Sequence, residues 1–195
     1  MVITAGLRQP SSSRLLADRL AATAGEQLAD AKIEIVELRE YARDLTNHLL
    51  TGFPSGHLSR LLDDVTAADA LIAVSPIFSG SYSGLFKTFF DVLEPGALAG
   101  KPVVIAATGG TARHSLVLDH ALRPLFSYLQ AVVLPTGVYA APEDWGSDGQ
   151  LSARVTRAVG ELAALIVAGD RPARPDSTDE VVDFEQLLAG LGDRG

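Results

Sequence analysis

The sequence predicts an α/β fold, a doubly wound five-stranded parallel β-sheet with helices on both faces. First, segments with strand and helix periodicity alternate five times along the chain. Second, the continuous apolar run from Ala70 to Val74 is typical of a central parallel strand that is buried on both faces. Third, 195 residues with 47% hydrophobic and 21% charged residues suffice for the core of one ordinary domain.

Each expected element follows from the spacing of its apolar residues. The first helix has Leu16, Leu20 and Ala24 at helical spacing, and the fourth strand is the apolar run from Val103 to Ala107. The expected strands cover residues 2–5, 33–36, 70–74, 103–107 and 131–134, and the expected helices cover 13–28, 58–68, 85–93, 116–129 and 151–167. These elements form one domain over residues 1–168.

The chain changes character after this domain. Residues 169–195 contain prolines and several acidic residues, followed by an apolar patch at Phe184, Leu187, Leu188 and Leu191. We expect a C-terminal tail that ends in a short docking helix. A disordered end explains the same pattern.

Composition excludes several classes of function. The sequence contains no cysteine, so it has no disulfide bonds, thiolate metal sites or cysteine nucleophiles. The formal net charge of −8, with the basic residues scattered singly, opposes binding to nucleic acid. No segment approaches the roughly 20 consecutive apolar residues of a membrane span, and no signal peptide is recognisable at Met1. We therefore expect a cytoplasmic protein with neither nucleic acid nor a membrane as partner.

The first loop of interest, residues 6–13, joins the first strand to the first helix. In open parallel sheets ligands bind beyond the carboxyl ends of the strands, where the winding direction reverses. Ser11, Ser12 and Ser13, with Arg8 nearby, either cap the free amides of the helix or surround a phosphate together with them. The loop contains neither a P-loop motif nor G-x-G-x-x-G, which favours a phosphomonoester over a nucleoside triphosphate or a dinucleotide.

Two further loops end buried strands at the same edge. In residues 75–84, the apolar and aromatic side chains are suited to lie along a planar ring, and a plain turn with its aromatics packed on the body is the alternative. The loop that begins at Thr108 has two glycines, which let the backbone approach a ligand closely, although a flexible turn explains them as well. Arg113 and His114 are then either exposed residues or contacts to a nicotinamide phosphate.

The three loops occur in the order and spacing of the NADPH-dependent FMN reductase family, which the chain resembles over residues 1–167. The resemblance is closest to the branch that supplies reduced FMN to two-component flavin-dependent monooxygenases of the luciferase-like and alkanesulfonate types. The first loop departs from the family's Gly-Ser-x-Arg-x-x-Ser-x-Asn pattern, with Leu7 after the glycine and Ser13 where Asn is common. Phe78 stands where many relatives have Tyr.

The resemblance implies a flavodoxin-like fold, FMN as cofactor and NADPH or NADH as hydride donor. It assigns the FMN phosphate to Arg8, Ser11, Ser12 and Ser13, the ribityl chain and ring to Pro76, Ile77, Phe78 and Tyr82, and the isoalloxazine edge to Thr108, Gly109, Gly110 and Thr111. Because the flavin carries the chemistry, no catalytic side chain is expected. The histidines show no metal-ligand spacing, so no metal site is expected either.

Several points stay open at the level of sequence. The apolar helix around His120 indicates a homodimer or homotetramer, although a helix buried in the core would look similar. The sequence does not distinguish NADH from NADPH, or FMN as a tight cofactor from FMN as a dissociable substrate. A quinone, azo-compound or metal-ion reductase with bound FMN, a flavodoxin-like electron carrier and a non-catalytic nucleotide-binding module are the alternative functions.

Overall fold

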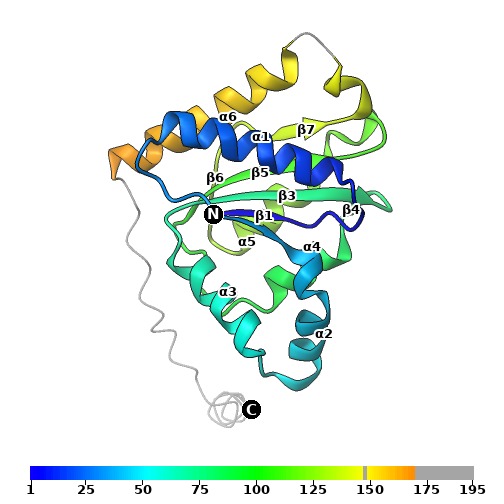
Figure 1. The fold of residues 1–195 in the computed structure, drawn as a ribbon, viewed down its shortest axis with the longest axis vertical. Coiled ribbons are helices and arrows are strands. Elements are labelled where there is room, and N and C mark those ends of the chain that lie inside the picture. Colours follow the sequence, from blue (N-terminus) through cyan, green and yellow to red (C-terminus); the bar gives the residue numbers. More distant parts are fainter. Residues whose placement is uncertain (147–148, 170–195) are drawn as a thin grey trace, which may run out of the picture.

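A computed structural model describes residues 1–146 and 149–169, and it places one sheet between two layers of helices (Figure 1). The parallel strands lie in the order β2 (Ile35–Glu37), β1 (Val2–Thr4), β3 (Leu71–Phe78), β5 (Pro102–Thr108) and β6 (Val132–Val133). This is the order of flavodoxin-like folds, in which the winding direction reverses between β1 and β3. The predicted fold class is confirmed.

The sheet contains two strands beyond the five expected. Its strands are β1 (Val2–Thr4), β2 (Ile35–Glu37), β3 (Leu71–Phe78), β4 (Ser81–Tyr82), β5 (Pro102–Thr108), β6 (Val132–Val133) and β7 (Val138–Ala140). β4 pairs antiparallel with the end of β3, and β6 and β7 both pair parallel with β5. The predicted fifth strand, residues 131–134, corresponds to the short strand β6. β7 was not predicted, and it follows β6 along β5 after an interruption at residues 134–137.

The helices divide between the two faces of the sheet. They are α1 (Ser12–Gln27), α2 (Ala42–Thr51), α3 (Gly56–Ala67), α4 (Gly84–Asp91), α5 (Arg123–Tyr128) and α6 (Gln150–Ala168), with a π-helical segment at Leu118–Leu122 and 3₁₀ turns at Leu38–Tyr41, Ala112–His114 and Pro142–Trp145. α1 and α6 cover one face, and α2 to α5 cover the other (Figure 1).

Alternating side chains of the strands supply the two cores. Ile3 and Leu71 point to the layer of α2 to α5, whereas their neighbours Val2 and Ile72 point to α1 and α6. The first core contains a cluster of phenylalanines, in which the ring centroids of Phe86 and Phe90 lie 4.7 Å apart. Helices thus cover both faces of the sheet, and the ends of the strands are the places where a ligand can reach it.

Three stretches differ from the sequence prediction. The polar stretch before the second predicted helix contains α2, in which Leu45 is the one buried residue. The loop expected at residues 75–84 begins as strand, because β3 continues to Phe78 and turns into β4. The helix expected at 116–129 starts with the π-helical segment before α5.

The C-terminal tail expected at 169–195 lies, apart from Gly169, outside the described residues. Within the ranges that the structure describes, no helix combines the length and the apolar character needed to cross a membrane.

Candidate functional site

A cavity of about 440 Å³ opens at the carboxyl ends of the parallel strands, which we call the carboxyl edge of the sheet. The three loops meet there. This volume lies in the range of small-molecule sites, and the place is the one at which doubly wound sheets bind ligands. The cavity is lined by Gly6, Leu7, Arg8, Pro10, Ser11, Ser12, Ser13, Pro76, Ile77, Phe78, Thr108, Gly109, Gly110 and Pro142. The structure therefore brings together most of the residues that the sequence nominated. Tyr82 and Thr111 are not among the lining residues.

The N-terminus of α1 supplies the donor-rich side of the cavity. Ser11 caps the helix, because its Oγ accepts a hydrogen bond of 3.3 Å from the amide of Arg14. The first-turn amides of Ser12 and Ser13 have no partner within an α-helix and carry the positive end of its dipole. A Cβ atom at Gly6 would lie 2.0 Å from Ser11 Oγ, so only glycine lets the strand end pack against this cap.

A buried hydrogen bond joins the first loop to the third. Ser13 Oγ and Thr108 Oγ1 lie 2.7 Å apart, and both side chains are nearly inaccessible to solvent. The hydroxyl of Ser13 is thus engaged with the protein, whereas its backbone amide remains at the helix start. Ser12 is exposed and its hydroxyl makes no hydrogen bond to any described residue.

The β3–β4 hairpin supplies an apolar wall. Ser79 and Gly80 form its tip with φ values of 50° and 82°, and the chain returns through Tyr82. At its base, buried Ser75 Oγ accepts a hydrogen bond of 3.0 Å from the amide of Ser83. Phe78 lines the cavity and is 47% exposed. An exposed aromatic side chain beside a cavity is a suitable surface for a planar ring.

The glycine loop after β5 closes the third side. Gly109 lines the cavity, and its amide donates to the carbonyl of Ala140 over 3.2 Å. Gly110 is exposed, with no atom within 4 Å of the place where a Cβ would stand. Thr111 is the N-cap of the 3₁₀ turn that carries Arg113 and His114, which are exposed and lie outside the cavity lining.

The charged residues described near the cavity differ in whether they are already paired within the protein. Arg14 is bound to Asp18 over 2.8 Å and to Glu37 over 2.7 Å, and the hydrogen bond to Asp18 is the main cause that raises its pKa. Arg14 is therefore engaged, and Arg8 is the one charged side chain among the described lining residues. In the described ranges, no group of three or more His, Cys, Asp or Glu residues could hold a metal ion.

A second cavity, of about 380 Å³, lies at the opposite end of the sheet, between Met1, the end of α1 and Ile166 of α6. It faces the amino ends of the strands, which are not where doubly wound sheets bind their ligands. Burial lowers the pKa of the Met1 amino group there, and this group donates to the carbonyl of Ala70 over 2.9 Å. We assign this cavity no part in the site.

The donors and walls of the first cavity fit a phosphorylated flavin. Helix amides, Ser12 and Arg8 suit a phosphate, and the hairpin wall and the glycine loop suit a flat ring with polar edges. The model of the NADPH-dependent FMN reductase family matches residues 1–146. The chain belongs to this family.

Relatives within the family match most of the chain. An FMN reductase (NADPH) of Pseudomonas aeruginosa is 40% identical over 174 residues, which cover 87% of this chain and 92% of that protein. The NADH-dependent FMN reductase SfnF of Pseudomonas fluorescens is 40% identical over 164 residues, which cover 84% and 87%. The crystal structure of an oxidoreductase from Corynebacterium diphtheriae superposes with a TM-score of 0.83 at 46% identity, over 86% of this chain and 95% of that one.

Membership of the FMN reductase family confirms the resemblance that the three loops indicated. Its members use FMN, with NADPH or NADH as the electron donor. Sequence reasoning missed Pro142, which reaches the cavity from the segment after β7. The signal was available, since the carboxyl end of the outermost strand meets the same edge of the sheet.

Proposed function

We propose that the protein is an NAD(P)H-dependent FMN reductase that binds FMN across the three loops at the carboxyl edge of the sheet. The observation that supports this proposal most directly is that one side of the cavity is polar and positively charged and the other side is apolar. The start of α1 with Arg8 offers hydrogen-bond donors and positive charge, and the β3–β4 hairpin with the glycine loop offers apolar surface and backbone groups.

Each part of the cavity receives one part of the cofactor in this proposal. Ser12, Arg8 and the first-turn amides of α1 hold the phosphate. Pro76, Ile77 and Phe78 lie along the ribityl chain and the ring, and Gly109 and Gly110 present backbone groups to the ring edge. Ser11, Ser13 and Thr108 hold the loops together. Tyr82 supports the hairpin by pairing with Ile77, and Thr111 supports the glycine loop by accepting the hydrogen bond from Tyr139.

When bound, FMN supplies the chemistry by accepting a hydride from NADPH or NADH at N5. The protein contributes binding and orientation. Among the described lining residues, none is an Asp, Glu, His, Lys or Tyr that could act as a general acid or base. The apolar wall would limit the access of water to the ring, and the half-exposed Phe78 would border the ring on the solvent side.

The biological role we propose follows the resemblance to the branch of the family that serves monooxygenases. The protein supplies reduced FMN to a flavin-dependent monooxygenase in the cytoplasm and acts as a homodimer or homotetramer. Size-exclusion chromatography with light scattering tests the oligomer, because a monomeric mass would remove that part of the proposal.

Turnover tests the enzyme activity. We expect the purified protein to oxidise NADPH or NADH, followed at the nicotinamide absorbance band, when FMN is added. Riboflavin should support slower turnover, since it lacks the phosphate that the start of α1 binds. Absence of both turnover and flavin binding would refute the proposal, and turnover that requires a quinone or an azo dye would favour the alternative reductases.

A further inference from the structure

Tyr139 lies directly behind the glycine loop of the cavity. It is 6% exposed, and its hydroxyl donates a hydrogen bond of 2.7 Å to the carbonyl of Thr111. A Cβ atom at Gly109 would lie 2.0 Å from the same hydroxyl oxygen. The tyrosine thus contacts the loop at both ends, and the glycine is needed for that contact.

The interruption between β6 and β7 determines where Tyr139 stands. Val103 pairs with Val133, and Ala106 pairs with Val138, so the outer strand uses two more residues than β5 between these pairs. Side chains alternate between the faces of a sheet with a period of two. An insertion of two residues therefore preserves the face to which each side chain points, and Tyr139 joins the core on the side of α5.

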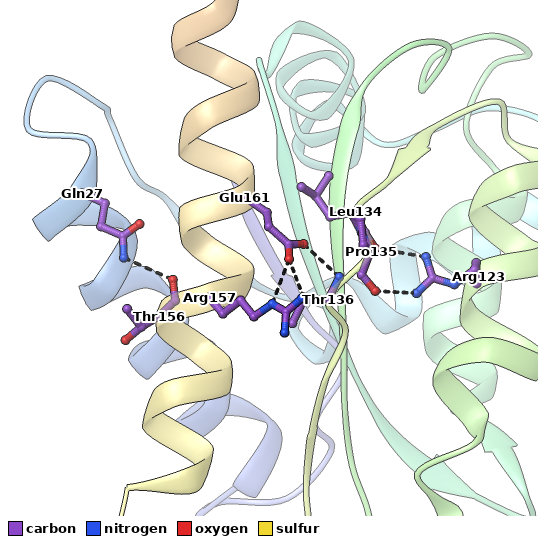
Figure 2. A network of polar contacts seen from close by, with 8 residues as sticks. All are labelled: Gln27, Arg123, Leu134, Pro135, Thr136, Thr156, Arg157 and Glu161. Atoms are coloured by element: carbon purple, nitrogen blue, oxygen red, sulfur yellow. Dashed lines mark hydrogen bonds and ion pairs between the residues drawn. The ribbon is translucent and has the colours of Figure 1, made fainter.

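Both helical layers hold this interruption in place (Figure 2). Glu161 of α6 accepts hydrogen bonds from the amide of Thr136 over 2.9 Å and from its hydroxyl over 2.5 Å. From the other side, Arg123 donates to the carbonyls of Leu134 over 3.0 Å and Pro135 over 3.1 Å. The segment cannot slide along β5 without breaking these contacts, so the position of Tyr139 is determined from two directions.

We propose that Tyr139 is a positioning residue for the flavin site, whose hydroxyl orients the backbone of Gly109 and Gly110 toward the ring edge through the Thr111 carbonyl. This inference rests on the proposed function. Tyr139 does not line the cavity, so it acts through the loop and not on the ligand. Burial, with Glu143 and Asp144 nearby, raises the pKa of Tyr139, which keeps the hydroxyl protonated as the donor.

Replacement of the hydroxyl tests the role. In Y139F without flavin, amide hydrogen exchange of residues 109–112 should accelerate, and the Kd for FMN should rise roughly three- to tenfold, the loss of about one hydrogen bond. The Kd for riboflavin should rise by the same factor, because the loop meets the ring and not the phosphate. The matched control is Y128F, since Tyr128 is 85% exposed, and it should change none of these values.

A double-mutant cycle tests the contact between the glycine and the tyrosine. G109A should weaken FMN binding strongly, because the added methyl group collides with the Tyr139 hydroxyl. In the double variant G109A/Y139F the hydroxyl is gone, and the nearest remaining ring atom, Cζ, lies 3.1 Å from the new Cβ. The double variant should therefore bind FMN more tightly than G109A alone, and additive losses would contradict the inference.

These experiments distinguish failure of the Tyr139 positioning role from failure of the proposed reductase function. If the wild-type protein neither binds nor reduces FMN, the proposed function fails, and the exchange data alone decide whether Tyr139 orders the loop. If the wild-type protein reduces FMN while Y139F has unchanged Kd values, the positioning role is overturned and the reductase function stands.

Discussion

Ser12 is the serine of the first loop whose side chain is left for a ligand. Ser11 Oγ caps α1, and Ser13 Oγ is held by Thr108, so two of the three hydroxyls serve the protein itself. Ser12 is exposed at the cavity. The run of three serines therefore divides into one cap, one tie between loops and one candidate phosphate contact.

We expect Ser12→Ala to weaken FMN binding roughly ten- to hundredfold, the effect of one hydrogen bond to a charged phosphate. Riboflavin binding should not change, because riboflavin has no phosphate. Flavin fluorescence titration measures both affinities. Ser127→Ala, an exposed serine on α5, is the control that should affect neither. Equal losses for both flavins would show that Ser12 does not contact the phosphate.

At the scale of elements, a buried lysine ends α3. Lys101 is 2% exposed, and its Nζ donates to the carbonyls of Val65 over 2.8 Å, Thr66 over 2.9 Å and Ala68 over 2.5 Å. These carbonyls belong to the last turn and the C-cap of α3, where the helix has no N–H groups left to donate to them and carries negative charge. Lys101 directly precedes β5, so it ties α3 to the strand that carries the glycine loop.

We expect Lys101→Met to lower the free energy of unfolding by at least about 2 kcal/mol, because it removes three hydrogen bonds to carbonyls that are buried or partly buried. Urea unfolding followed by circular dichroism measures this change. Lys32→Met is the matched control, since the Lys32 side chain is 91% exposed, and it should cost less than about 0.5 kcal/mol. A similar stability for the two variants would contradict the capping role of Lys101.

The free energy of unfolding should depend on pH through Glu161, which holds the interruption between β6 and β7. Partial burial of Glu161 acts to raise its pKa, but the hydrogen bonds from Thr136 and Arg157 outweigh burial and hold the pKa below its ordinary value of 4.5. A carboxyl group whose pKa is lower in the folded than in the unfolded protein stabilises the fold at pH values above its unfolded-state pKa. This contribution is lost as the pH falls through the pKa of the folded state. The interruption should therefore weaken below about pH 4.5.

We expect Glu161→Gln to destabilise the protein by about 1 kcal/mol at neutral pH. The difference from the wild-type protein should shrink as the pH falls below the ordinary pKa of glutamate. Urea unfolding at a series of pH values measures it, with Glu26→Gln, an exposed residue of α1, as control. A difference that stays constant down to acid pH would mean that the charge of Glu161 does not stabilise the interruption.

At the scale of the whole molecule, ligand binding at the carboxyl edge should stabilise the fold. At a concentration 100 times its Kd, FMN adds about 2.7 kcal/mol to the free energy of unfolding. For a domain of this size we expect a rise in Tm of roughly 5–10 °C. Riboflavin at the same concentration should raise Tm less, and differential scanning fluorimetry compares the two. Equal shifts would argue against a phosphate subsite.

The overall architecture could be predicted because the buried strands and amphipathic helices carry strong periodic patterns. α2 escaped prediction since it buries only Leu45 and otherwise shows a polar surface. β7 also escaped prediction, since the interruption that separates it from β6 is held by Glu161 and Arg123 from two different helices. The three loops could be nominated from their composition. The pairing of Ser13 with Thr108 and of Tyr139 with Thr111 is tertiary, and no local pattern encodes it.

A crystal structure of the protein with FMN tests the central claim most directly. We predict that the phosphate lies at the start of α1 beside Ser12 and Arg8, and that the ring lies between Phe78 and the backbone of Gly109. Flavin bound in the cavity at the opposite end of the sheet, or with its phosphate away from α1, would contradict the site proposed for this protein.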